Sequence, residues 1–328
     1  KIAFWQVDAT KVRDYYMLNT TDSVYSRIIP VEYPKVGQPP SPVRIGVITV
    51  SNDNIKWMNI PGDPQEHYLP RMEWADNSDQ LVVQQLNRKQ NESKLFYCNA
   101  STGNATKFYS EDDKAFIDIK SRWNDDDPTG WDWLDKGKDF LWVTEKDGWR
   151  HIYLVSRTGK ETLVTKGNYD IDNIKCIDDK NGYVYFMASP YNVTQRYLFR
   201  TKLDGTGKLE PLSPSGEVGT HDYNISPEAK YAFHTFSNYK TFPAGEWVSL
   251  PGGQPLNPEK SIANNMKVNE NSNVHYFKVT TEDNVTLDGW MVYPDNFDST
   301  KKYPVVFYVY GEPAASTVGD RFGAQHNF

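Results

Sequence analysis

The sequence predicts a mostly β fold built as a β-propeller, and three features indicate it. Aromatic residues make up 14 % of the 328 residues, and such side chains favour the half-buried faces of pleated sheets. Twenty-one glycines and twenty prolines supply the turns that many short strands need. A strand–turn–strand unit recurs along the chain, while long amphipathic helical patterns are absent.

The recurring unit consists of a strand end, a five-residue polar turn and an apolar strand. Four turns share this layout: Ala75–Asp79, Asp135–Asp139, Asp178–Gly182 and Ser226–Lys230. They lie roughly 40 to 60 residues apart, close to the length of a four-stranded propeller blade, with the longest interval enlarged by a loop. The spacing therefore predicts consecutive blades.

A second hairpin follows within the later units. Its turns are Arg157–Lys160, Asp204–Gly207 and Gly252–Gly253, and glycine-rich turns between short β-rich runs are hairpin signals. Residues 1–7 have the pattern of a strand that would itself follow such a turn. We therefore expect residues 1–265 to form an incomplete propeller that starts inside a blade, with one partial blade and four fuller ones.

The character of the sequence changes after about residue 265. Three strand-like runs follow, at Val274–Thr280, Val285–Tyr293 and Pro304–Tyr310. The last run is nearly continuously apolar, which is typical of a strand covered on both faces. Residues 266–328 are therefore predicted to begin a second domain of the α/β class.

Charge and composition exclude several functions. The net charge of −7 argues against nucleic acid as the main partner, because phosphate binding relies on a basic surface. No apolar run approaches the roughly 18 residues of a membrane-spanning helix. Two lone cysteines, Cys98 and Cys176, do not form a disulfide framework. The six histidines are scattered without H-x-x-x-H spacing, so we predict no metal site and no cofactor, although a site assembled from distant residues stays open.

Two segments of the repeated region, Glu73–Asp76 and Glu145–Tyr153, are familiar. They resemble parts of the eight-bladed propeller of the dipeptidyl peptidase IV family of prolyl oligopeptidase-type serine peptidases. Lys301–Val306 and the motif Val309–Pro313 are similar to the opening strands of its α/β-hydrolase domain. The resemblance covers almost the whole chain in order.

This resemblance implies a serine exopeptidase that releases N-terminal dipeptides, with Pro or Ala in the second position, and whose propeller gates the substrate. It implies peptide substrates with free N-termini, a parent protein that can be a homodimer, and an extracytoplasmic location (periplasmic, secreted or surface-anchored). Tyr310 matches the family's tyrosine whose hydroxyl helps to stabilise the oxyanion.

The remaining catalytic groups are expected outside this chain. The sequence contains no G-x-S-x-G motif, the strained turn that presents a nucleophilic serine. The catalytic Ser, Asp and His are therefore expected elsewhere in the parent protein, and the chain by itself is expected to be inactive. One alternative is a non-enzymatic accessory or binding protein with a degenerate hydrolase domain. Another is a free-standing binding propeller, which the hydrolase-like tail disfavours.

Overall fold

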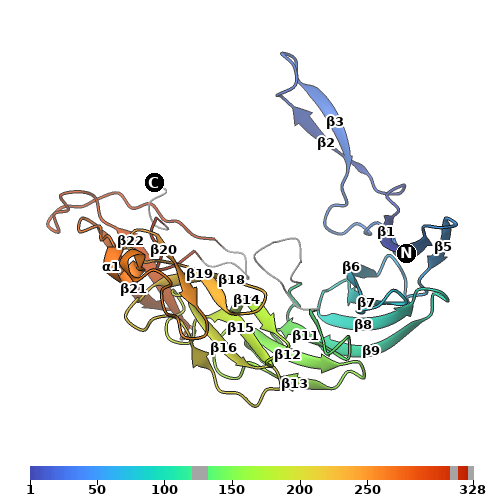
Figure 1. The fold of residues 1–328 in the computed structure, drawn as a ribbon. Helices are drawn as coiled ribbons and strands as arrows, with labels where there is room; N and C mark the ends of the chain where they lie inside the picture. The colour runs from blue at the N-terminus through green and yellow to red at the C-terminus, as the bar shows by residue number, and fades with distance from the viewer. Residues whose placement is uncertain (120–131, 311–316, 324–328) are drawn as a thin grey trace. The chain divides into compact units, whose positions relative to one another are not determined.

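The computed structural model describes residues 1–119, 132–310 and 317–323. In these residues nearly all regular structure is antiparallel β-sheet, which confirms the predicted fold class (Figure 1). No helix in this part of the chain is both long and apolar enough to cross a membrane. The chain divides into two compact units, which we describe separately. They consist of Lys1–Ser121, Trp133–Leu141 and Val155–Glu161, and of Arg122–Asp132, Trp142–Leu154 and Thr162–Phe328.

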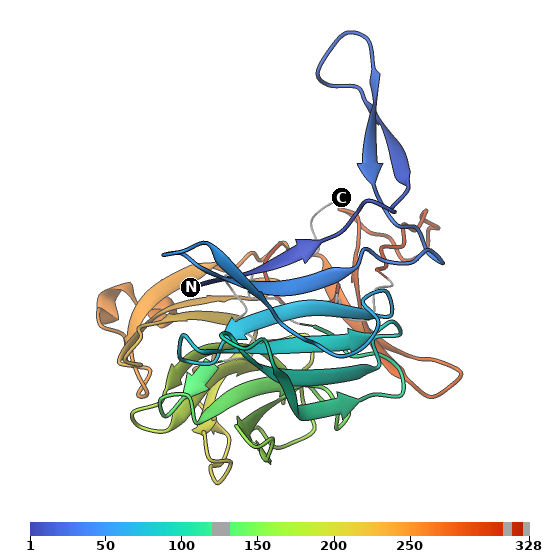
Figure 2. The same cartoon turned by 90° about the vertical axis from the view of Figure 1, so that its right-hand side faces the viewer.

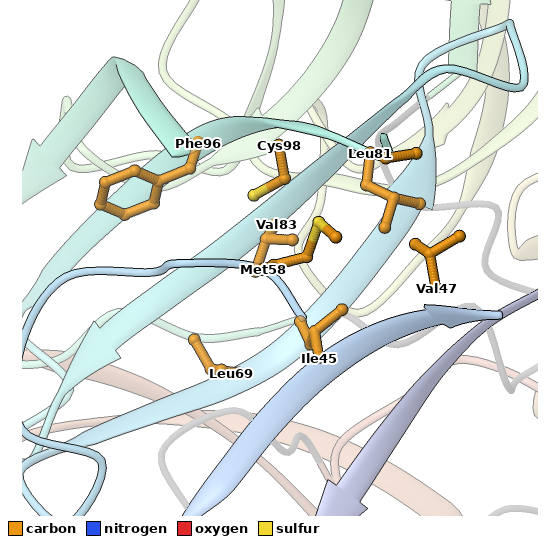
Figure 3. Packing of buried hydrophobic residues seen from close by; sticks show 9 residues of the cluster. Ile45, Val47, Met58, Leu69, Leu81, Val83, Phe96 and Cys98 are labelled. Atoms are coloured by element: carbon orange, nitrogen blue, oxygen red, sulfur yellow. The ribbon is translucent and has the colours of Figure 1, made fainter. Parts of the chain in front are cut away.

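A four-stranded sheet holds the core of the first unit. Its strands pair antiparallel in chain order: β6 (His67–Trp74), β7 (Gln80–Asn87), β8 (Glu92–Asn99) and β9 (Ala105–Asp112). Figure 3 shows Leu81 and Val83 of β7 beside Phe96 and Cys98 of β8, all fully or almost fully buried. Both faces of β7 are covered, so its residues are buried without interruption from Leu81 to Leu86, the polar Gln84 and Gln85 included.

A three-stranded sheet packs against this core. It has the order β1 (Ile2–Val7), β4 (Val43–Thr49) and β5 (Asn54–Trp57), so the strand predicted over residues 1–7 is confirmed. Ile45 and Val47 of β4 contribute their side chains to the same apolar cluster (Figure 3). Between β1 and β4 the chain leaves this sheet as a separate hairpin of β2 (Asp14–Asn19) and β3 (Arg27–Glu32), which extends away from β1 in both views (Figures 1 and 2).

A further sheet has the order β10 (Asp132–Leu134), β11 (Asp139–Thr144), β12 (His151–Ser156) and β13 (Glu161–Leu163). Two more sheets follow in the second unit. The first contains β14 (Ile171–Asp178), β15 (Tyr183–Ala188), β16 (Tyr197–Lys202) and β17 (Glu210–Pro211). The second contains β18 (Thr220–Ile225), β19 (Tyr231–Ser237) and β20 (Ala244–Ser249). Tyr185, Met187 and Leu198 of the first sheet share one apolar cluster with Tyr223 and Val248 of the second.

The four predicted turns all lie between paired antiparallel strands. Each contains a residue in the left-handed region: Asp76 (φ 54°), Gly137 (φ 78°), Gly182 (φ 72°) and Ala229 (φ 50°). A left-handed residue lets the chain reverse within a few residues, which brings the next strand back beside the previous one. The recurring unit in the sequence is therefore the hairpin between the first two strands of four of the sheets.

Of the three strands predicted after residue 265, the first two form and the third does not. A 3₁₀ turn (η1, Pro258–Lys260) and a short helix (α1, Ile262–Asn265) lead to a hairpin of β21 (Val274–Thr280) and β22 (Thr286–Val292), as expected. The prediction of a strand over Pro304–Tyr310 is wrong for this structure, since no described strand pairs with that segment. Its apolar side chains are largely exposed, with Phe307 at 85 %. A strand that is apolar on both faces forms only where partner strands and covering layers are available.

Leu81 tests the packing of the first unit, because its side chain is completely buried. We expect Leu81→Ala to lower the free energy of unfolding by about 2–5 kcal/mol, through lost apolar burial and the cavity left behind. Val36→Ala is the matched control, since Val36 is fully exposed and its truncation should change the free energy by less than about 0.5 kcal/mol. Urea unfolding followed by tryptophan fluorescence measures both, and equal midpoints would contradict the packing described here.

Candidate functional site

Tyr310 lies in the extended segment that follows β22. Tyr310 is 57 % exposed in this segment. Gly311, Glu312 and Pro313, which complete the motif, lie outside the described residues. The oxyanion role of Tyr310 therefore stays a prediction.

The last described segment of the chain is anchored through Asp320, which is 7 % exposed. Its carboxylate accepts hydrogen bonds from the side chain of Gln195 (2.8 Å) and the backbone N–H of Tyr239 (3.0 Å). Its own N–H donates to the carbonyl of Thr194 (2.7 Å), and its carbonyl accepts from the hydroxyl of Thr220 (2.7 Å). These bonds fix the chain beyond the Tyr310 motif against the ends of strands β16, β18 and β19.

A second group of polar residues lies inside the sheet β18–β19–β20. We call Glu217, His221, His234 and Glu246 the His–Glu cluster; each is at most 8 % exposed. Buried and exposed residues alternate along all three strands, so their inward positions share one face. His234 stands opposite Tyr223 on β18 and opposite Glu246 on β20. Pairing register therefore brings the cluster together.

The cluster is joined by short contacts between ring nitrogens and oxygens. Nδ1 of His221 lies 2.8 Å from Nε2 of His234, and Nε2 of His221 lies 2.7 Å from the carbonyl oxygen of Glu217. Nδ1 of His234 lies 3.1 Å from one carboxylate oxygen of Glu246, whose other oxygen accepts the N–H of Ile262 at 3.1 Å. Oε2 of Glu217 lies 3.9 Å from Nε2 of His234 and is buried without a hydrogen-bond partner among the described residues.

Burial dominates the electrostatics of the cluster. Loss of solvation lowers the pKa of both imidazoles, so both rings are neutral near neutral pH. Burial, together with the charge of Glu246, raises the pKa of Glu217 to about 7. Burial also raises the pKa of Glu246, and the hydrogen bond from the N–H of Ile262 opposes this rise. Neutral imidazoles leave ring lone pairs available inside the cluster.

Sequence reasoning missed this cluster. Its four residues show no ligand motif, because they come from a loop and three different strands. The signal that could have indicated it is the alternation of polar and apolar residues in β18 and β19, which places His221 and His234 at inward positions. Only the register between the strands shows that these positions meet.

Comparisons with known proteins all find similarity to dipeptidyl peptidases and dipeptidyl-aminopeptidases. The family described as the dipeptidyl peptidase IV (DPP IV) N-terminal region matches residues 1–243. The chain is 26 % identical over 307 residues to the probable dipeptidyl peptidase 4 of Emericella nidulans, a match that covers 91 % of this chain and 39 % of that protein. It is 27 % identical over 320 residues to the probable dipeptidyl-aminopeptidase B of Aspergillus oryzae, covering 91 % and 34 %.

Solved structures show the same likeness. The crystal structure of Porphyromonas gingivalis dipeptidyl peptidase 4 matches 98 % of this chain and 44 % of that chain, with a TM-score of 0.81 and 27 % identity. A putative dipeptidyl aminopeptidase IV from Bacteroides ovatus matches with a TM-score of 0.77 and 22 % identity, a likeness of fold. The chain spans less than half the length of each of these proteins.

The anchor at Asp320 can be tested directly. Asp320→Ala leaves the buried side-chain donor of Gln195 and the part-buried N–H of Tyr239 unpaired, and we expect the free energy of unfolding to fall by about 1–3 kcal/mol, mainly through Gln195. Glu270→Ala, at an exposed position, serves as the control for loss of a carboxylate. Chemical unfolding compares the two variants; an Asp320→Ala midpoint equal to that of the control would refute the anchor.

Proposed function

Because the chain belongs to the dipeptidyl peptidase IV family, we propose that it is the substrate-gating propeller portion of a serine exopeptidase. The parent protein releases N-terminal dipeptides, Xaa-Pro or Xaa-Ala, from peptides with free N-termini. The observation that carries this proposal is the family match over residues 1–243, and the likeness to the P. gingivalis structure across 98 % of the chain supports it. Family membership also supports a homodimeric parent and an extracytoplasmic location.

The chemistry is divided between this chain and the rest of the parent protein. A serine attacks the scissile carbonyl, a histidine takes the serine proton, and an aspartate orients the histidine. This chain supplies Tyr310, whose hydroxyl donates a hydrogen bond to the oxygen that becomes negative as the tetrahedral intermediate forms. A donor held in place for that developing charge stabilises the transition state more than the bound substrate. The exposure of Tyr310 is consistent with this role.

The proposed activity is tested with the full-length protein on Gly-Pro or Ala-Pro chromogenic amides. We expect turnover that disappears when the substrate N-terminus is acetylated, since an exopeptidase of this kind recognises the free ammonium. Residues 1–328 alone should show no turnover and no labelling by a serine-directed fluorophosphonate. A folded full-length protein without turnover would instead favour the accessory-protein alternative.

The role of Tyr310 has its own test in the same assay. Removal of one oxyanion donor by Tyr310→Phe should lower kcat on the order of 10²–10³-fold, with a much smaller change in KM. Tyr308→Phe is a matched control, because Tyr308 lies two residues away in the same extended segment and is similarly exposed at 54 %. An unchanged kcat in Tyr310→Phe would exclude the role.

A further inference from the structure

We propose that the His–Glu cluster is a binding site for one divalent transition-metal ion, Zn²⁺ by preference. The ligands are Nδ1 of His221, Nε2 of His234 and the carboxylate of Glu217, whose ligand atoms lie within 4.8 Å of one another. Glu246 orients His234 from outside the metal's coordination shell. The proposed role of the ion is to hold the loop that carries Glu217 against the sheet.

The outer ring nitrogens are arranged as in protein metal sites. A carbonyl oxygen can only accept, so Nε2–H of His221 donates to the carbonyl of Glu217. Nδ1–H of His234 donates to the carboxylate of Glu246, which the N–H of Ile262 holds in place. Metal-binding histidines almost always donate their second N–H to a carbonyl or carboxylate in this way, which fixes the tautomer and turns the lone pair toward the ion.

This assignment places two lone pairs face to face. With both outer nitrogens protonated, the inner nitrogens of the neutral rings, Nδ1 of His221 and Nε2 of His234, are both acceptors 2.8 Å apart. In this tautomer the contact needs a cation between the nitrogens, either an additional proton or a metal ion. The alternative, in which Nε2–H of His234 donates to Nδ1 of His221, requires a protonated Glu246 that donates to Nδ1 of His234. The buried carboxylate oxygen of Glu217 beside them lacks a donor among the described residues, and a metal ion would satisfy all three groups at once.

The charges of the cluster favour a divalent ion. In the described part of the chain, the nearest basic group to the carboxylates of both Glu217 and Glu246 is the imidazole of His234. Two carboxylates buried this close together are costly away from water unless a cation or donor faces them. A divalent cation would face the carboxylate of Glu217 directly and that of Glu246 through His234.

The ligand set selects the type of metal. Two imidazoles and one carboxylate suit Zn²⁺ and its first-row neighbours, whereas Ca²⁺ and Mg²⁺ prefer oxygen ligands alone. A tetrahedral ion with bonds of about 2.0–2.1 Å needs ligand atoms about 3.3 Å apart. The two imidazoles therefore separate slightly on binding and the carboxylate moves inward. Three protein ligands leave the fourth position to water, and the exposed loop residues Gly216 and Val218 on either side of Glu217 offer the route for the ion.

The variant Glu217→Gln tests whether the cluster binds a metal ion or is held by hydrogen bonds alone. The carboxylate of Glu217 makes no hydrogen bond among the described residues, so the amide of similar size leaves the His221–His234–Glu246 contacts in place. It removes an anionic metal ligand. We expect the full-length protein, freed of metal with a chelator, to bind one more equivalent of Zn²⁺ than Glu217→Gln in a competition titration with a chromogenic chelator. The Zn²⁺ affinity of the variant at this site should be at least tenfold lower.

Two further measurements complete the test. Glu246→Gln should weaken Zn²⁺ binding by about 10–100-fold, as loss of an orienting carboxylate does. Co²⁺ added to the wild type should give the visible absorption bands of a tetrahedral ion, and these should be absent in Glu217→Gln. His275→Gln, on β21 and outside the cluster, is the control and should bind like the wild type. Equal Zn²⁺ stoichiometry and affinity in wild type and Glu217→Gln would overturn the proposal and leave a proton-bridged histidine pair.

Discussion

Burial of the inner faces of neighbouring sheets against each other, within each unit, is the constraint on which the rest of the structure depends. In the first unit, Val47 of β4 packs with Leu81 of β7 and Cys98 of β8 in one apolar cluster. In the second, Leu198 of β16 packs with Val248 of β20 in another. A single twisted sheet cannot bury both faces alone, so each hairpin unit is stabilised mainly through its neighbours. Positions that face inward therefore become the cores, and outward positions are free to vary.

This constraint explains why the His–Glu cluster is unusual. Inward positions of β18–β20 hold apolar residues such as Ala232 and Val248, yet the same face also carries His221, His234 and Glu246. Buried polar groups cost free energy unless they are paired. The two imidazoles also pack against aromatic rings, with Tyr223 stacked on His234 and Phe236 tilted against His221. The pairing within the cluster is therefore decisive for this part of the second unit, and a bound metal ion would complete it.

Tyr310 illustrates the opposite case, a functional prediction that rests on resemblance. The segment around it is extended and exposed, although its apolar sequence is that of a covered strand. By contrast, Asp320 is buried and its carboxylate accepts hydrogen bonds from Gln195 and Tyr239. The chain is therefore anchored a short distance beyond the motif. The segment that carries Tyr310 therefore pairs with none of the described strands, whereas Asp320 is held by hydrogen bonds from several strand ends of this chain.

The sequence by itself determined the β class, the positions of the four turns and the hairpin of β21 and β22, because these follow from local features. Turn residues such as Gly182 and strand alternation act over a few positions, and the segment Glu145–Tyr153 is specific enough to indicate the family. Only the tertiary structure decided that the hairpin of β2 and β3 leaves its sheet, that Pro304–Tyr310 does not pair, and that His221 meets His234. Each of these depends on which strands become neighbours and in what register, and no local stretch of sequence contains that information.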